Sequence, residues 1–219
     1  MLNIFQIFDR KNEVPSIVKE NILKLNDNIN YQLFDFKDGK EFIKKNFEIN
    51  ISNKLINRID NLTRYAHKSD LLRYCLLYKL GGIYLDIDLK PLVPFRQIIK
   101  NYDFVTQLSD EINNSVVNGF IYTKKNNPWI FAEIKFLMKM GSYSKHNVPC
   151  SHFYNNLNSY LDMKTYSELN LGNLKCYFNL EIKKEDEKFY IVDKDNNVLI
   201  NSNNHNYPSN LKFKKYAFR

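Results

Sequence analysis

The chain has 219 residues and a formal net charge of +8, with 44% hydrophobic and 15% aromatic residues. This aromatic content excludes an intrinsically disordered chain, and the six glycines and six prolines exclude collagen-like and proline-rich classes. The positive charge permits an anionic partner, such as a nucleic acid, a membrane surface or a phosphorylated ligand, without selecting one of them.

The first third of the chain alternates predicted strands with predicted helices. Residues 2–8 and 31–36 alternate apolar and polar side chains, which favours strands, and residues 15–25 repeat apolar side chains at helical spacing. An Asp-Gly pair at 38–39 predicts a turn into a further short helix. This order of elements is typical of a parallel sheet with crossover helices.

The middle of the chain contains the most regular predicted helices. Residues 52–65 form one, and Ser69 is expected to cap a second that ends at the Gly-Gly pair 81–82. No repeat or linker interrupts the pattern, so we expect a single domain over residues 1–219. The remaining predicted elements are strands at 83–89, 103–108 and 116–123, a helix at 129–140 that begins after Pro128, and a hairpin of 189–192 with 198–200.

The cysteines and the N-terminal residues bear on the cellular compartment. Cys75, Cys150 and Cys176 are odd in number and widely spaced, so we expect neither a disulfide framework nor a zinc site. The N-terminus lacks the pattern of a cleavable signal, and no run approaches the ~18 apolar residues of a membrane span. We therefore expect a soluble, cytoplasmic protein without an integral membrane segment, of bacterial or viral origin.

The chemistry is concentrated between residues 66 and 95. Asp70 and Arg73 are three residues apart on the predicted helix and therefore share a face. On the strand that follows, alternation places Tyr84, Asp86 and Asp88 on one side. Two carboxylates on one side repel each other, and a divalent cation that bridges them to an anionic ligand offsets that repulsion. Mg²⁺ and Mn²⁺ prefer such oxygen ligands and often combine one or two carboxylates with substrate phosphates.

Each of these features also has a simpler structural explanation. A lone Asp-x-Asp is usually a solvated strand end, an Asp–Arg pair at this spacing is usually a surface salt bridge, and a Gly-Gly pair is usually a turn. Their order and spacing together are far more specific. His67, His146 and His152 have no Cys or Glu at ligand spacing, so we expect them to be structural or at the surface.

The segment from Ala66 to Phe95 resembles the signature of the glycosyltransferase family 32 type. These enzymes are DXD sugar transferases related to the initiating α-1,6-mannosyltransferases of yeast and, more distantly, to the glucosylating clostridial toxins. The matching residues are Ser69, Asp70, Arg73, Tyr74, Leu77, Tyr78, Gly81, Gly82, Ile83, Tyr84, Leu85, Asp86, Asp88, Pro91 and Leu92.

The resemblance implies an α/β fold of GT-A type, with a Rossmann-like mixed sheet flanked by helices and a small C-terminal hairpin and tail. It also implies a hexosyltransferase that uses a UDP- or GDP-sugar donor, Mn²⁺ or Mg²⁺, and the hydroxyl of a glycan or glycoprotein acceptor. Members of the family retain anomeric configuration, so we expect retention, with front-face attack by the acceptor as our hypothesis.

By position, the resemblance assigns Asp70 and Arg73 to the donor-sugar hydroxyls. It assigns Asp86 to the ribose and the sugar, and Asp88, with Asp86 beside it, to the metal. His205 would complete the metal or phosphate site, although the Trp that the family often carries after this His is absent. We expect Asp70, Arg73, Asp86 and Asp88 to be the catalytic set.

Five further residues are expected to contact the donor. The end of the first strand, with Phe5, Gln6 and Phe8, would line the nucleotide pocket. Here the family's usual His-Gln-Ile-Trp reads Phe-Gln-Ile-Phe, so base stacking could survive on Phe8 but the His role could not. Tyr84 faces the same side as the carboxylates, and Asn118 matches an Asn that the family carries near the donor sugar.

Two other functions remain open from the sequence. A non-catalytic relic could bind a nucleotide sugar without turnover, although the intact acidic and basic residues argue against it. A basic module that stacks RNA bases on its 16 Phe and 15 Tyr residues is the second. Most of these aromatic residues occupy apolar-periodic positions and no nucleic-acid signature is present, so we do not expect a nucleic-acid partner.

Overall fold

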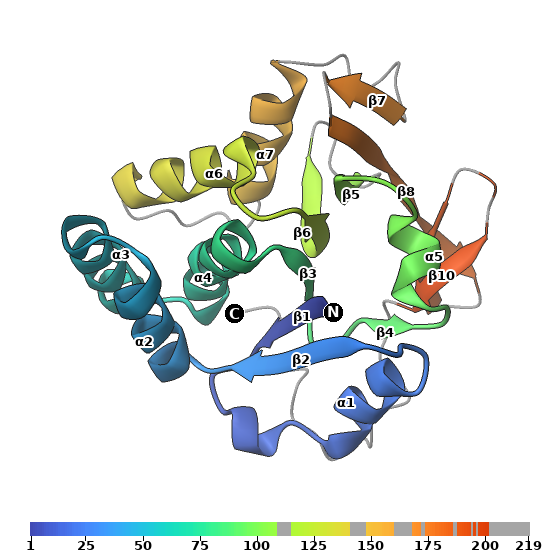
Figure 1. Ribbon diagram of the computed structural model, residues 1–219, viewed down its shortest axis with the longest axis horizontal. Coiled ribbons are helices and arrows are strands. Elements are labelled where there is room, and N and C mark those ends of the chain that lie inside the picture. Colours follow the sequence, from blue (N-terminus) through green and yellow to red (C-terminus); the bar gives the residue numbers. More distant parts are fainter. Residues whose placement is uncertain are drawn as a thin grey trace.

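A computed structural model describes residues 1–108, 115–140, 148–159, 168–171, 174–185, 188–193, 195 and 197–201 (Figure 1). Its sheet has the order β2-β1-β3-β6-β5-β8-β9-β10-β4, with β7 paired to β8. The strands are β1 (Leu2–Ile7), β2 (Ile29–Phe34), β3 (Gly82–Leu85), β4 (Lys90–Pro91), β5 (Phe104–Leu108), β6 (Val116–Thr123), β7 (Glu168–Leu171), β8 (Leu174–Glu185), β9 (Lys188–Val192) and β10 (Val198–Asn201).

Helices precede and follow these strands in the alternating order that the sequence predicts for the first third. They are the 3-10 helix η1 (Lys11–Glu13) and the α-helices α1 (Ser16–Leu23), α2 (Phe36–Asn46), α3 (Ile49–Asn61), α4 (Tyr65–Leu80), α5 (Phe95–Ile99), α6 (Pro128–Lys139) and α7 (Val148–Asn158). None of the helices described is both long and apolar enough to cross a bilayer.

The strands β2, β1, β3, β6 and β5 form the mixed part of the sheet that organises the fold. β1 pairs in parallel with β2 and with β3, whereas β6 is antiparallel to both β3 and β5. The carboxyl ends of the three parallel strands therefore lie at one edge. In open α/β sheets that edge is where ligands bind.

Both faces of this sheet are covered, as the alternation of apolar side chains requires. Phe5 and Tyr84 point to one face, where α2, α3, α4, α6 and α7 pack on the larger core. Ile4 and Ile83 point to the other, where α1, α5 and β10 close the second core (Figure 1). This arrangement confirms the predicted α/β sheet flanked by helices.

The junction of α4 and β3 is unusually tight. Gly81 and Gly82 adopt φ angles of 61° and 112°, in the region that favours glycine. A Cβ on Gly82 would lie 2.4 Å from the carbonyl oxygen of Asn3 on β1. The chain can therefore reverse directly from the buried helix into the central strand.

Several predicted boundaries were wrong. The Asp-Gly pair at 38–39 lies inside α2, which begins earlier because Asp35 and Asp38 form a capping box. α4 begins at Tyr65, so Ser69 lies within the helix and does not cap it. The strand predicted at 83–89 ends at Leu85, and the chain turns immediately afterwards.

The later elements were predicted unevenly. The strands at 104–108 and 116–123, the helix after Pro128 and the antiparallel β9–β10 hairpin are confirmed. The sequence did not indicate α5, α7, β7 or the 12-residue strand β8, which links β5 to the hairpin.

Candidate functional site

Arg73 is the centre of a buried group of polar side chains at the carboxyl end of β3. It lies on α4 with only 5% of its surface exposed. Its Nη2 is 3.3 Å from Oδ1 of Asp70, and its Nη1 is 3.4 Å from Oδ1 of Asp86. The guanidinium also lies over the ring of Tyr84, 4.3 Å from the ring centroid. One cation therefore connects the helix to the strand end.

The charge of Arg73 is maintained despite its burial. Burial alone would lower its pKa, but the neighbouring Tyr84, Asp86 and Asp70 raise it above the usual value. A buried pair of this kind is costly to break, because removal of one partner leaves an uncompensated charge. The sequence alone left a surface salt bridge as the simpler explanation for Asp70 and Arg73, and the 2% exposure of Asp70 excludes it.

Asn118 joins β6 to this group. Its side-chain amide donates a 2.8 Å hydrogen bond to Oδ1 of Asp70. Its main-chain carbonyl accepts a 2.6 Å hydrogen bond from Nη1 of Arg73. Three predicted site residues from two distant segments thus meet in one network, which fixes the orientation of the Asp70 carboxylate.

Asp86 follows the last residue of β3 and keeps 37% of its side chain exposed. The Tyr84 hydroxyl donates a 2.6 Å hydrogen bond to its Oδ1, and its main-chain N–H donates to the carbonyl of Gly119 at 2.8 Å. A Cβ on Gly119 would lie 2.9 Å from Oδ2 of Asp86. The carboxylate is therefore anchored through one oxygen, and glycine leaves room for the other.

Asp88 lies two residues further on, in a turn and not in the predicted strand. The Leu89 N–H donates to the Asp86 carbonyl at 3.1 Å, which closes that turn. Burial of Asp88, and then the negative charge of Asp86, raise the pKa of the Asp88 carboxyl to about 7. The negative charge of Asp86 thus acts on Asp88, as expected for two carboxyl groups that could share a cation.

The two carboxylates fit a divalent metal held partly by substrate. Among the residues that the structure describes, no group of three or more His, Cys, Asp and Glu side chains could enclose an ion. Mg²⁺ and Mn²⁺ are commonly bound by one or two carboxylates together with substrate phosphates, so a pair is sufficient. His205, the predicted third ligand, lies outside the described residues.

The end of β1 lies beside this turn. Gln6 is fully buried; its amide donates to the main-chain oxygen of Asp86 at 3.2 Å and accepts from the Tyr31 hydroxyl at 2.8 Å. Phe5 is also fully buried and packs edge-on against Phe34. Phe8 follows the strand, where its N–H donates to the Phe34 carbonyl. Gln6 thus supports the Asp-x-Asp turn, while the predicted nucleotide contacts of all three residues stay predictions.

Two residues near the site were not predicted. Tyr31, on β2, donates its hydroxyl hydrogen bond to Gln6. Nothing in the sequence around Tyr31 distinguishes it from other strand residues, so this contact was not predicted. Cys150 lies on α7, in the electrostatic environment of Asp70, Arg73 and Asp86. The sequence gave little indication of α7, so its contact with the site could not be anticipated.

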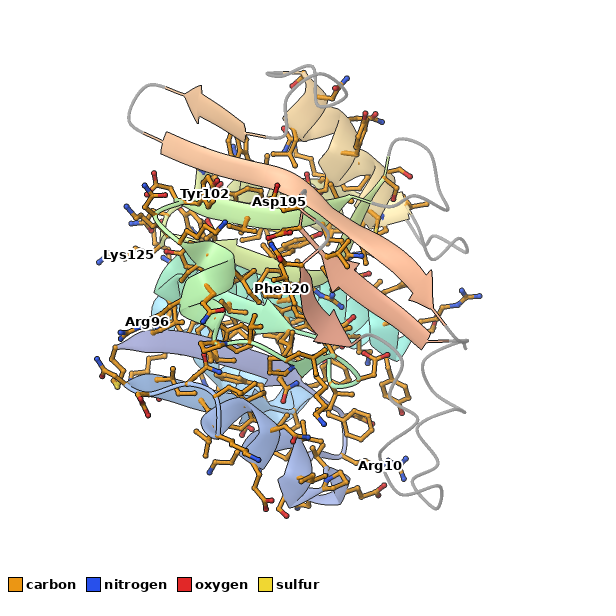
Figure 2. The ribbon with its side chains drawn as sticks, turned by 90° about the vertical axis from the view of Figure 1, so that its right-hand side faces the viewer. Arg10, Arg96, Tyr102, Phe120, Lys125 and Asp195 are labelled. Atoms are coloured by element: carbon orange, nitrogen blue, oxygen red, sulfur yellow. The ribbon has the colours of Figure 1, made fainter. Side chains whose placement is uncertain are left out.

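Many of the aromatic side chains in the described part of the chain lie in the two cores. Most of the largest fully buried side chains are aromatic, so these rings fill the two cores. Phe120, on β6, belongs to the second core and lies near the middle of the view in Figure 2, whereas Arg10, Arg96 and Lys125 lie toward the outside. The fully buried aromatic residues are Tyr74, Tyr84, Phe5, Phe95, Phe104, Phe120 and Phe153.

Comparisons with known proteins agree with this geometry. Residues 15–105 match the family model described as the glycosyltransferase sugar-binding region containing the DXD motif. An uncharacterized glycosyltransferase of Acanthamoeba polyphaga mimivirus is 31% identical over 121 residues, which are 52% of this chain and 46% of that protein. The chain thus spans slightly less than half the length of this curated relative.

Among solved structures, the PaToxG glycosyltransferase is similar in fold. The TM-score is 0.53 at 18% sequence identity, and the match covers 75% of this chain and 71% of that one. At this identity the likeness concerns the fold alone.

Proposed function

Since residues 15–105 belong to the DXD-containing sugar-binding region of the GT-A-like glycosyltransferases, we propose that this protein is a metal-dependent hexosyltransferase. It transfers a hexose from a UDP- or GDP-sugar to a hydroxyl of a glycan or a glycoprotein. The observation that carries this proposal is the buried Arg73, which holds Asp70 and Asp86 together beside Asp88.

Asp70, Arg73 and Asn118 form the sugar end of the proposed site. A hexose presents several hydroxyl groups that both donate and accept hydrogen bonds. The Asp70 carboxylate can accept from them, and the Arg73 guanidinium can donate. Because the network of Asn118 and Arg73 already orients Asp70, little entropy is lost when the sugar binds.

Asp86 and Asp88 form the diphosphate end. Mn²⁺ or Mg²⁺ held there would supply positive charge to the departing nucleoside diphosphate, which is the Lewis-acid contribution of a metal. Asp88 must release its proton to serve as a ligand. The carboxylate of Asp86 is already oriented by the hydroxyl of Tyr84 and the guanidinium of Arg73. We propose His205 as a further ligand.

The nucleotide would lie over the ends of β1 and β2. Phe8 is the proposed stacking surface for the base, since it lies just beyond β1 at the carboxyl edge. Gln6 contributes indirectly, because its side-chain amide donates a hydrogen bond that fixes the main chain of Asp86. Phe5 supports this strand end from within the core.

We propose that the reaction retains configuration by front-face attack of the acceptor hydroxyl. A double displacement needs a carboxylate that is available as a nucleophile. Arg73 lies beside both Asp70 and Asp86, which also accept hydrogen bonds from Asn118 and Tyr84, and these contacts lower their nucleophilicity. Asp88 is committed to the metal, so none of these three carboxylates is available for covalent attack.

Donor hydrolysis tests the proposal. The protein is incubated with UDP-glucose, UDP-galactose, UDP-GlcNAc, UDP-GalNAc and GDP-mannose, with Mn²⁺ or with EDTA, and released nucleotide is measured. We expect metal-dependent release from one donor and its loss in Asp88→Ala. Asp60→Ala is the matched control, because Asp60 is an exposed carboxylate on α3 that pairs with Lys40.

Two results would contradict the proposal. One is release that is equal in EDTA and Mn²⁺. The other is the absence of both release and thermal stabilisation with every donor in the presence of Mn²⁺. Stabilisation without release would indicate a competent donor site that requires its acceptor.

A further inference from the structure

The main chain of the Asp-x-Asp turn is held from the face of the sheet opposite to α4. We propose that Tyr31, on β2, is a positioning residue for the metal end of the site, because its hydroxyl fixes the orientation of the Gln6 amide that holds this turn. This inference rests on the proposed function, since the turn carries the two carboxylates to which that function assigns the metal.

Gln6 links β1 to the first residue of the turn. It is fully buried, and it lies two residues after Ile4, so alternation along β1 points both side chains toward the second core. Its Nε2 donates a 3.2 Å hydrogen bond to the main-chain oxygen of Asp86. The same oxygen accepts the 3.1 Å hydrogen bond from the Leu89 N–H that closes the turn. Gln6 therefore fixes the turn from outside it.

The orientation of the Gln6 amide is decided by its two neighbours. A carbonyl oxygen can only accept hydrogen bonds, so the Asp86 carbonyl must face the amide nitrogen. The amide oxygen then faces the Tyr31 hydroxyl at 2.8 Å, and this hydroxyl donates. The reverse orientation would place two acceptor oxygens against each other. Tyr31 thus stabilises the one orientation in which Gln6 holds the turn.

Tyr31 reaches Gln6 across the parallel pair of β1 and β2. The register places Tyr31 beside Ile4 and Gln6 beside Leu33, so the two polar side chains are diagonal neighbours on one face. The ring of Tyr31 packs against the second core, and the Lys19 ammonium lies 5.9 Å from the ring centroid. These contacts restrict the ring, so the hydroxyl stays directed at Gln6.

The two faces of the sheet hold different parts of Asp86. On the face covered by α4, the Tyr84 hydroxyl and the Arg73 guanidinium contact its carboxylate. On the second face, Gln6 holds its main chain, with Tyr31 behind it. Loss of the Tyr31 hydroxyl should therefore release the turn and weaken cation binding, while the sugar end of the site keeps its contacts.

Binding of Mn²⁺ in the presence of UDP or GDP tests this inference without turnover. The dissociation constant for Mn²⁺ is measured by titration for the parent protein, Tyr31→Phe, Gln6→Met and the double variant. Tyr122→Phe is the matched control, because Tyr122 packs against the same core from β6 and its substitution removes the same hydroxyl group. The thermal unfolding midpoint of each metal-free variant is recorded in parallel.

We expect Gln6→Met to weaken Mn²⁺ binding by about tenfold, as is typical of residues that orient metal ligands. Tyr31→Phe should weaken it by about three- to tenfold. The double variant should bind no more weakly than Gln6→Met, since Tyr31 acts through Gln6. The ratio of affinities for nucleotide sugar and nucleoside diphosphate should be unchanged in Tyr31→Phe. Tyr122→Phe should bind Mn²⁺ as the parent protein does, even if its unfolding midpoint falls.

The outcomes separate this inference from the proposed function. Unchanged Mn²⁺ affinity in Tyr31→Phe, or an equal loss in Tyr122→Phe, would overturn the inference and leave the function standing. Effects of Tyr31→Phe and Gln6→Met that add in the double variant would also overturn it, because Tyr31 would then not act through Gln6. A changed affinity ratio in Tyr31→Phe would do the same. Absence of Mn²⁺ binding by the parent protein with either nucleotide would overturn both proposals.

Discussion

Asp88 should make cation binding at the proposed site depend on pH near neutrality. Burial and the adjacent Asp86 raise the pKa of its carboxyl to about 7. Only the carboxylate binds a cation, so each ion bound below that pH displaces a proton. The dissociation constant for Mn²⁺ should therefore rise about tenfold between pH 8 and pH 6, whereas a carboxyl with an ordinary pKa would leave it unchanged.

The same shift has a consequence for the stability of the metal-free protein. A carboxyl whose pKa is higher in the folded state stabilises the fold while it is protonated. That contribution is complete below the ordinary pKa of Asp and is lost as the pH rises through about 7. Mn²⁺ should restore the lost stability above pH 7, because it replaces the proton with a cation.

Isothermal titration with Mn²⁺ at pH 6, 7 and 8, with thermal unfolding at each pH, measures both effects. Asp88→Asn should bind Mn²⁺ weakly at every pH and should remove the loss of stability between pH 4 and pH 7. Asp60→Asn, an exposed control, should behave as the parent protein. A dissociation constant that is constant from pH 6 to pH 8, or an unchanged pH dependence in Asp88→Asn, would refute the reasoning.

Three substitutions test other contacts of the fold and the site. Gly39→Ala should lower the free energy of unfolding by about 1–3 kcal/mol in chemical denaturation, because its Cβ would lie 2.4 Å from a methyl carbon of Leu72; an unchanged midpoint would disprove this packing. Asp35→Ala should cost about 1 kcal/mol in the same assay by removing the N-cap of α2, and a neutral result would mean that water replaces the cap. Gly119→Ala should displace the Asp86 carboxylate and lower donor hydrolysis by about tenfold or more, while the unfolding midpoint changes little. Full activity in that variant would show that Asp86 does not need its present position.

The sequence predicted the parts of the fold in which local pattern and burial agree. Apolar residues recur at strand spacing in β1 and β2 and at helical spacing in α3, so these elements were found with boundary errors of a few residues. The errors at α2 and α4 have a common cause, because helix starts depend on side-chain capping and tertiary packing that periodicity does not show. β8 escaped prediction since its residues lack regular alternation, and its pairing with β5 and β9 comes from distant segments.

The candidate site was predictable to the extent that it lies on one short segment. The spacing of Asp70, Arg73 and Asp86 is local, and the resemblance to a known family named their roles. The contact of Asn118 with Asp70 required that resemblance, because 48 residues separate the two. Neither the local spacing nor the resemblance could predict that Cys150 lies near the site, because its position depends on how α7 packs against β6.

The two glycines between α4 and β3 set the distance between two parts of the site. A Cβ on Gly82 would collide with the main chain of Asn3 on β1, and one on Gly81 with the main chain of Lys125 just after β6. The position of Asp70 relative to Asp86 therefore depends on two residues that have no side chain and contact neither carboxylate. A substitution at either glycine would disturb the site through the main chain, with every side chain of the site unchanged.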